Sequence, residues 1–200
     1  MSHQARETAA APTPSGRGCR CLILSLVVAA LIYAADQLTK LWVVAELPVG
    51  QQVPVIPGLL WWQHIRNSGA AFSLGSDFTW IFTVVMAAVV VFIAATLRKV
   101  RHPIWAVGLG LVLGGASGNL TDRLLREPSF GQGHVVDFIA VPNFAIFNLA
   151  DCGVVVGIAV IMVLILGDRD MTRPAHRRPA GTGDQASSES QTERPAPDHD

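Results

Sequence analysis

The chain has 200 residues, of which 50% are hydrophobic and only 15% are charged, and its formal net charge at pH 7 is zero. Because a soluble domain usually carries about 25% charged residues, this composition excludes an ordinary soluble protein and predicts a membrane protein. No basic stripe with interleaved aromatic residues is present, which argues against nucleic acid as a partner. Cys19 and Cys21 precede the first apolar segment and Cys152 lies within the last, so we expect no disulfide framework.

Four segments are long and apolar enough to cross a bilayer, which takes roughly 20 residues of α-helix. In chain order they run from Cys21 to about Ala45, from Thr79 to Leu97, from Ile104 to about Leu125, and from about Phe147 to Gly167. The first does not fit a cleaved signal peptide, because no small-residue cleavage site follows it and the apolar pattern continues past Lys40. We therefore expect an all-α membrane protein with four transmembrane helices in one membrane domain, residues 21–167.

The two ends of the chain, residues 1–20 and 168–200, are rich in small, polar and charged residues and in proline. They lack apolar periodicity, so we expect both to be disordered. Lysine and arginine concentrate in these ends and around residues 98–102, which by the positive-inside rule places both termini and that loop in the cytoplasm. The loops at 46–75 and 124–146 then lie on the extracytoplasmic side.

The first extracytoplasmic loop has a β-prone pattern. Residues 52–56 and 60–65 are rich in apolar and aromatic side chains, and Pro57 and Gly58 between them are typical of a turn. Trp61 and Trp62 favour the interface between membrane and water. We therefore expect a small extracytoplasmic β-element that lies on the membrane surface.

Polar and charged residues within and beside the apolar segments fall toward the extracytoplasmic side. They are Asp36, Asn67, Asn119, Asp122, Arg123, Asp137, Asn148 and Asp151. A carboxylate at membrane depth costs about 3 kcal/mol or more, so a chain that keeps several close together usually uses them. Because unrelated polar residues would be spread over both leaflets, this convergence predicts a functional site at one membrane face.

Helical spacing groups several of these residues. Asp36 and Lys40 stand four apart with the acid first, which is the best order for an intrahelical ion pair, and we expect this pair to be structural rather than catalytic. Two further groups each share one helix face: Asn119, Asp122 and Arg123, and Asn148 with Asp151. The small residues Gly114, Gly115 and Gly118 predict the close approach of another helix.

Asp137 and Asp151 are the candidates for catalysis. The short segment 138–147 has only to fold back on itself to bring the two carboxylates together. Two neighbouring carboxylates share a proton and titrate as a pair. The ionised one can take a proton from water while the protonated one donates to a peptide carbonyl, which is the chemistry of an aspartic peptidase.

Other hydrolytic chemistries lack their residues in this sequence. A metal site needs clustered ligands, but His64 and His134 stand alone in their loops and are more typical of surface residues. Ser68 and Ser73 have no paired base and no nucleophile-elbow motif, and no glycine-rich phosphate loop is present. We therefore expect neither a metal nor another cofactor.

Five short blocks together carry a family resemblance. They are Asp36-Gln37-Leu38-Thr39-Lys40, Arg66-Asn67-Ser68-Gly69-Ala70-Ala71-Phe72-Ser73, Gly118-Asn119-Leu120-Thr121-Asp122-Arg123, Val135-Val136-Asp137-Phe138 and Phe147-Asn148-Leu149-Ala150-Asp151. In this order they resemble the signature blocks of lipoprotein signal peptidase, also called signal peptidase II. Five blocks in register are far more specific than any one of them.

The resemblance implies an intramembrane aspartic endopeptidase that removes signal peptides from bacterial prolipoproteins, cleaving before the diacylglyceryl-modified cysteine. It implies that Asp137 and Asp151 are the catalytic dyad. Four residues would orient the dyad and the substrate: Asn67, Asn119, Arg123 and Asn148. Four others would support the structure of the site: Asp36, Lys40, Gly69 and Asp122. It also implies contact with membrane lipid, binding of a globomycin-type inhibitor, and a place in the bacterial cytoplasmic membrane with the site toward its extracytoplasmic face.

Two alternatives remain from the residues alone. A small transporter or proton-relay subunit also keeps acidic and basic residues in its membrane segments. It would need a polar route through both leaflets, yet the cytoplasmic halves of the four spans carry no ionisable residue. The other alternative is a lipid-binding or assembly subunit without chemistry.

Overall fold

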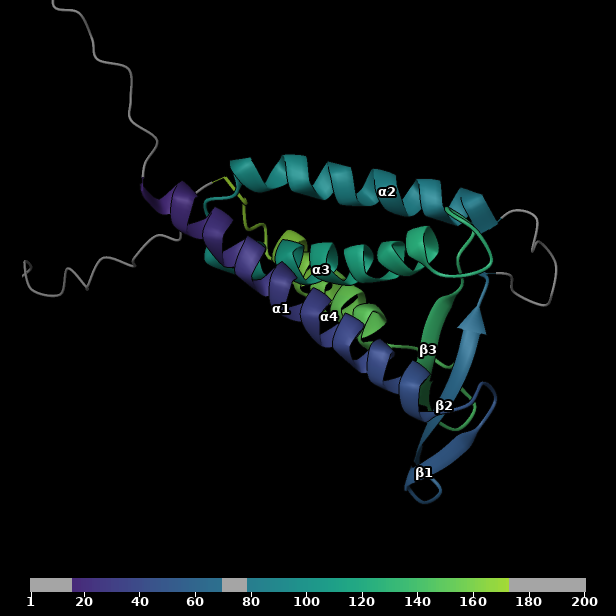
Figure 1. The fold of residues 1–200 in the computed structure, drawn as a ribbon. Coiled ribbons are helices and arrows are strands. Elements are labelled where there is room, and N and C mark those ends of the chain that lie inside the picture. Colours follow the sequence, from purple (N-terminus) through teal and green to yellow (C-terminus); the bar gives the residue numbers. More distant parts are fainter. Residues whose placement is uncertain (1–15, 70–78, 173–200) are drawn as a thin grey trace, which may run out of the picture.

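The computed structural model describes residues 16–69 and 79–172 (Figure 1). Its long helices are α1 (Gly16–Glu46), α2 (Thr79–Thr96), α3 (Pro103–Leu125) and α4 (Leu149–Leu166), and a short 3-10 helix, η3 (Leu97–Lys99), follows α2. All four long helices have the length and hydropathy to cross a membrane. The prediction of four transmembrane helices is therefore confirmed.

The ends of the membrane domain differ from the expected boundaries. Helix α1 begins at Gly16 rather than near Cys21, so residues 16–20 are helical and not part of a disordered tail. Residues 168–172 also follow α4 as ordered turns, because the Trp105 indole donates to the Arg169 carbonyl at 2.9 Å. The rest of both predicted tails lies outside the described residues.

Helix α3 lies at the centre of the bundle. Of its most apolar stretch 67% is buried, compared with 22% for α1, 17% for α2 and 22% for α4. Glycines allow this central position. A Cβ at Gly114 would collide with the Ala29 carbonyl oxygen of α1, and one at Gly115 with the Ala150 carbonyl oxygen of α4. The predicted close helix approach is confirmed at these glycines, where backbone packs on backbone.

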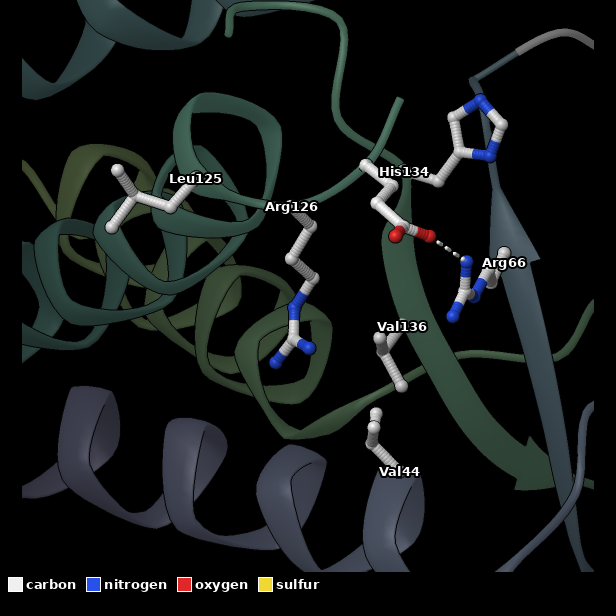
Figure 2. A pocket seen from close by; sticks show the side chains of 7 residues that line it. Val44, Arg66, Leu125, Arg126, His134 and Val136 are labelled. Atoms are coloured by element: carbon white, nitrogen blue, oxygen red, sulfur yellow. Dashed lines mark hydrogen bonds and ion pairs between the residues drawn. The ribbon is translucent and has the colours of Figure 1, made fainter. Parts of the chain in front are cut away.

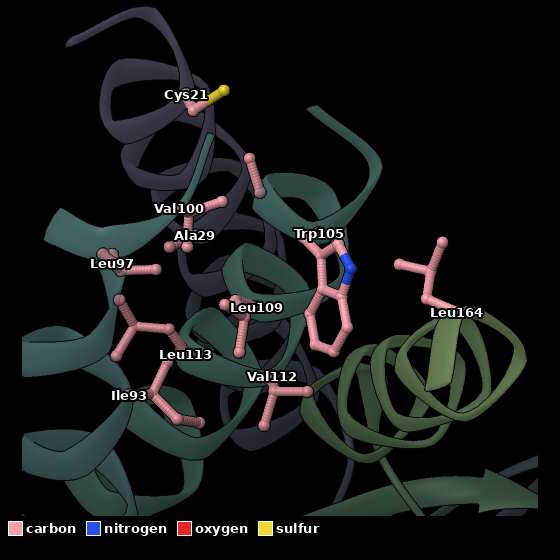
Figure 3. Packing of buried hydrophobic residues seen from close by; sticks show 11 residues of the cluster. Cys21, Ala29, Ile93, Leu97, Val100, Trp105, Leu109, Val112, Leu113 and Leu164 are labelled. Atoms are coloured by element: carbon pink, nitrogen blue, oxygen red, sulfur yellow. The ribbon is translucent and has the colours of Figure 1, made fainter. Parts of the chain in front are cut away.

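The apolar core lies toward the end of the bundle where α1 begins. Figure 3 shows Trp105, Leu109 and Leu113 of α3 between Ile93 of α2 and Leu164 of α4. Outside this core, the helices expose large apolar side chains such as Phe92, Val155 and Leu166. Exposed apolar faces on long helices are expected where lipid is the solvent.

A three-stranded antiparallel sheet covers the opposite end, in the order β1 (Gln52–Ile56), β2 (Leu60–Asn67), β3 (Val135–Ala140) (Figure 1). We call this the sheet end; there α1 and α3 end and α2 and α4 begin. The predicted β-element of the first loop is confirmed as the β1–β2 hairpin. The third strand was not predicted, since the segment around Asp137 was expected to be a loop.

One face of the sheet packs on the end of α1. Val136 and Phe138 of β3 form a buried cluster with Val43 and Leu47. Side chains alternate along a strand, so Asp137, between these two apolar residues, faces the other side of the sheet. His64 of β2 was expected at the surface but is buried, with its Nδ1 2.7 Å from the Leu47 carbonyl oxygen.

Candidate active site

Asp137 is held by two asparagine side chains. Its Oδ1 accepts a hydrogen bond of 2.6 Å from Asn148 Nδ2, and its Oδ2 accepts one of 2.9 Å from Asn67 Nδ2. Only 2% of the residue is exposed. Burial raises the pKa of Asp137 to about 6, and the nearby Asp151 carboxylate adds to the rise, while the bonds from Asn67 and Asn148 oppose it. The carboxylate is therefore easier to protonate than an exposed aspartate.

Asp151 lies in the first turn of α4 and forms a capping box with Asn148. The Asn148 side-chain oxygen accepts from Asp151 N at 3.0 Å, and Asp151 Oδ2 accepts from Asn148 N at 3.2 Å. Its other oxygen, Oδ1, accepts from Asn119 Nδ2 at 2.8 Å. The start of α4 thus fixes the position of this carboxylate through its own helix cap.

Asn148 connects the two carboxylates. Its side-chain amide donates to Asp137 and to Asn119, and its oxygen caps the helix that carries Asp151. Segment 138–147 folds back on itself as predicted, since Ile139 and Phe147 exchange backbone hydrogen bonds of 2.8 and 3.1 Å. Asp137 on β3 and Asp151 on α4 therefore both contact Asn148.

A buried ion network lies behind the two carboxylates. Lys40 Nζ is 2.8 Å from an oxygen of Asp36, of Asp122 and of Asn119, and the Lys40, Asp36 and Asp122 side chains are fully buried. The Asp36–Lys40 pair was predicted from its spacing and is present. Asp122 is a second anionic partner that spacing could not identify, because it comes from another helix.

The same network fixes the elements that carry the carboxylates. Asp36 Oδ1 accepts from Ala150 N at 3.0 Å, which ties α1 to the first turn of α4. Asp122 Oδ2 accepts from Val136 N at 3.2 Å, which ties α3 to β3. Asp36 and Asp122 therefore hold the helix of Asp151 and the strand of Asp137 in place.

Arg123 and Gly69 lie side by side, next to the buried ion network. Arg123 donates to the Ser68 carbonyl at 3.3 Å, and its guanidinium carbon lies 5.5 Å from the centre of the Phe82 ring. Among the described residues, its Nε has no hydrogen-bond partner, and it forms no ion pair with Asp137 or Asp151. A Cβ on Gly69 would lie 2.9 Å from the guanidinium and from the Phe82 ring, and Gly69 has a φ of +86°.

Two further residues, Gln37 and Arg126, contribute to the buried ion network and were not predicted from the sequence. Gln37 donates to the Asp36 carboxylate at 3.1 Å and to the Gly118 carbonyl at 3.0 Å. Arg126 donates to Asp122 from its Nε at 2.7 Å. Its spacing of four residues from Asp122 on one helix was the available signal. Within residues 16–69 and 79–172, no group of three or more His, Cys, Asp or Glu side chains has a metal-holding arrangement.

Residues 28–167 match the family model described as Signal peptidase (SPase) II. The matched range contains the larger part of α1, the other three long helices and the whole sheet. The chain belongs to the signal peptidase II family. The family predicted from the five sequence blocks is thus confirmed, and the chain is a peptidase of a bacterial membrane-enzyme family rather than a transporter subunit.

Named relatives and solved structures agree with this assignment. The chain is 46% identical over 158 residues to a lipoprotein signal peptidase of Leifsonia xyli, covering 78% of this chain and 73% of that protein. It is 44% identical over 174 residues to one of Mycobacterium avium, covering 87% and 96%. A solved bacterial membrane enzyme superposes with a TM-score of 0.65 at 28% identity, covering 77% of this chain and 94% of that one.

Proposed function

We propose that the chain is an intramembrane aspartic endopeptidase that removes signal peptides from bacterial prolipoproteins, cleaving before the diacylglyceryl-modified cysteine. The observation that carries the proposal is the shared asparagine. Asn148 joins Asp137 to Asp151, and all four carboxylate oxygens accept hydrogen bonds from amide groups. Membership of the signal peptidase II family supplies the substrate class.

The two carboxylates divide the acid and base roles by sharing one proton. Asp137 is the more deeply buried of the two, and its pKa is raised to about 6, so the shared proton resides mainly there. Each oxygen that accepts one amide hydrogen bond keeps a further lone pair for water or substrate. Asp151, half-exposed at the start of α4, is then the general base.

Hydrolysis follows from these roles. A water molecule adds to the scissile peptide carbon as its proton passes to the Asp151 carboxylate, and the carbonyl oxygen takes the proton of Asp137. As the resulting diol collapses and the C–N bond breaks, a diol hydroxyl gives its proton to Asp137, and protonated Asp151 gives its proton to the leaving nitrogen. Asn67, Asn119 and Asn148 hold the two carboxylates throughout, because each donates to one of them or to their shared frame.

Arg123 supplies donors for the substrate backbone in this proposal. Its guanidinium stacks beside Phe82 and contacts Ser68, and its buried Nε lacks a partner among the described residues. A guanidinium carries five N–H donors, of which one bonds Ser68, so its Nη nitrogens can donate to a peptide carbonyl of the substrate. Gly69, which leaves room for this guanidinium, has a supporting part.

The placement in the membrane suits a lipid-anchored substrate. The basic residues Arg98, Lys99 and Arg101 lie at the end of the bundle opposite the sheet, so we infer that both termini are cytoplasmic and that the sheet end faces outward. The diacylglyceryl group stays among membrane lipids while the peptide bond reaches the carboxylates at the ends of the spans. A globomycin-type inhibitor is expected to compete for the same site.

A cleavage assay tests the function and the cut position together. The full chain in detergent is incubated with a diacylglyceryl-modified precursor peptide and, as a matched control, with the same peptide carrying an unmodified cysteine. Mass spectrometry of the products is expected to show one cut before the modified cysteine and little cleavage of the control. Equal cleavage of both peptides, or a cut elsewhere, would contradict the proposal.

A further inference from the structure

A partly polar pocket lies at the sheet end, on the face of the sheet that carries Val136 rather than Asp137. It has a volume of about 230 Å³ and is lined by Val44, Arg66, Leu125, Arg126, Glu127, His134 and Val136. A liquid water occupies about 30 Å³, so the space fits a small polar group such as a phosphodiester. The mechanism proposed above uses none of these side chains.

The donors in this pocket are arranged for an anion. Figure 2 shows the Arg126 side chain extending into the space bordered by Val44 and Val136. Its Nε is held by Asp122 at 2.7 Å, whereas its two Nη nitrogens have no partner among the described residues. Arg66 uses Nη1 on Glu127 at 2.8 Å, so its other guanidinium nitrogens are also open. Each guanidinium is paired with a carboxylate through one nitrogen, so the pocket offers an anion the remaining N–H donors of Arg66 and Arg126.

The position of the pocket selects the source of the anion. Val44 lies in the last turn of α1, and Leu125 is the last residue of α3, so the pocket lies at the level where two membrane-spanning helices end. Leu125 is 76% exposed and Val44 is 39% exposed, which provides an apolar wall below the guanidinium. A phosphate with acyl chains attached matches both the donors and this wall, since phospholipid headgroups lie at this depth.

We propose that this pocket binds the phosphodiester of a phospholipid from the leaflet at the sheet end. The planar fork of Arg126 holds two phosphate oxygens, Arg66 and His134 contribute from the sheet and loop, and the acyl chains pass Val44 and Leu125. The diacylglyceryl group of the proposed substrate carries no phosphate. The lining contains neither Asp137 nor Asp151, so the pocket is distinct from the candidate active site.

The bound phosphate is connected to the carboxylate pair through the ion network. Arg126 Nε contacts Asp122 at 2.7 Å, Asp122 contacts Lys40 at 2.8 Å, Lys40 contacts Asn119 at 2.8 Å, and Asn119 donates to Asp151 at 2.8 Å. Four consecutive contacts thus join the lipid pocket to one reacting carboxylate. Arg126 is a positioning residue in this scheme, and this second step rests on the proposed function.

Binding is measured first, without reference to activity. Delipidated full-length protein in a maltoside detergent is titrated with dihexanoyl phosphatidylglycerol and followed by native mass spectrometry. Sodium phosphate and dihexanoylglycerol serve as competitors that separate the phosphate from the acyl chains. We expect neither competitor alone to displace the phospholipid at matched concentration. Equal displacement by dihexanoylglycerol, or by sodium phosphate, would overturn the proposal.

Three variants locate the site. Arg126→Gln removes the fork and is expected to weaken binding by about tenfold or more, since charged hydrogen bonds are lost. Val44→Phe fills the pocket from its apolar wall without touching Asp122, and the same loss is expected. The exposed Arg98, at the other end of the bundle, provides the control Arg98→Gln, for which binding stays within about twofold. Wild-type binding in both pocket variants would overturn the proposal.

Activity then tests the connection. Phosphatidylglycerol is expected to raise kcat of the wild-type protein with little change in KM, and to have no effect on Arg126→Gln. Phospholipid binding with an unchanged kcat would overturn the connection to Asp151 while leaving the site in place. Absence of cleavage in every sample would contradict the proposed function and leave the binding result standing.

Discussion

The side-chain amide of Asn148 donates a 2.6 Å hydrogen bond to the carboxylate of Asp137. The same residue is the N-cap of the helix that carries Asp151, so one side chain both starts a helix and positions the partner carboxylate. Helix caps are usually discussed for stability. Here the cap residue also contacts both candidate carboxylates, one through its side chain and one through its backbone N–H.

Substitutions can separate the two roles of Asn148, which caps α4 and donates a hydrogen bond to Asp137. Asn148→Ala loses the cap, at about 1 kcal/mol, together with the bond to Asp137. Asn148→Ser keeps an N-cap oxygen but cannot reach Asp137. We predict that both variants lose at least about tenfold in kcat, and that Asn148→Ala, which also loses the cap, lowers the Tm more than Asn148→Ser does. Full activity in Asn148→Ser would show that the bond to Asp137 is dispensable.

Lys40 is predicted to be essential for stability. Lys40→Met leaves Asp36 and Asp122 buried without their shared cation, which costs about 3–5 kcal/mol when one partner of a buried pair is removed. Thermal unfolding in detergent measures the loss. The control is Glu127→Gln, which breaks an ion pair whose side chains are 44% and 80% exposed and should cost less than about 1 kcal/mol. Equal effects of the two variants would contradict the assigned importance of the network.

Gly69 offers a test of the Arg123 position with a matched control. Gly69→Ala strains a φ of +86° and places a Cβ 2.9 Å from the guanidinium and Phe82. Gly58→Ala strains a similar φ of +78° with nothing within 4 Å. Each costs about 1–2 kcal/mol of backbone strain. Only Gly69→Ala is predicted to lower kcat/KM as well, and equal activity of both variants would remove Arg123 from the proposed substrate contacts.

The raised pKa of Asp137 predicts how stability depends on pH. The folded protein keeps a proton on Asp137 up to about pH 6, whereas an ordinary aspartate loses it near 3.8. The folded state therefore binds more protons than the unfolded state in this window, and stability falls as pH rises through it. Asp137→Asn has no proton to lose there. The Tm of Asp137→Asn minus that of the wild type should therefore increase as pH rises from about 4 to 6.

The control for this pH series is Asp168→Asn, at an exposed position after α4 with a φ of 50°, which asparagine tolerates. Its pH dependence is expected to follow the wild type. A Tm difference between Asp137→Asn and wild type that stays constant with pH would show that Asp137 does not hold its proton more tightly in the folded protein.

Hydropathy and short spacings predicted much of this architecture. Four apolar segments of sufficient length have few alternatives, and the i, i+4 pair of Asp36 and Lys40 follows from helix geometry alone. The second anionic partner of Lys40 comes from α3, far away in the chain. That contact depends on how two helices pack, which local patterns do not encode.

The third strand shows a different limit. Residues 135–140 form a short, almost continuous apolar run beside a membrane-spanning segment, so their pattern does not distinguish a strand from a membrane edge. The strand forms because β2 offers it an open edge, with Ile65 paired to Asp137. The pocket around Arg126 is also a tertiary feature, since its lining comes from four separate parts of the chain.

The central claim is that Asp137 and Asp151 together cleave the substrate, and the most direct measurement is the turnover of Asp137→Asn and Asp151→Asn on a diacylglyceryl-modified precursor peptide. Each variant is predicted to lose about 10²-fold or more in kcat, the usual contribution of a positioned acid or base, while its folding remains intact by thermal unfolding. Asp168→Asn should cleave like the wild type. Wild-type turnover in either dyad variant would contradict the account.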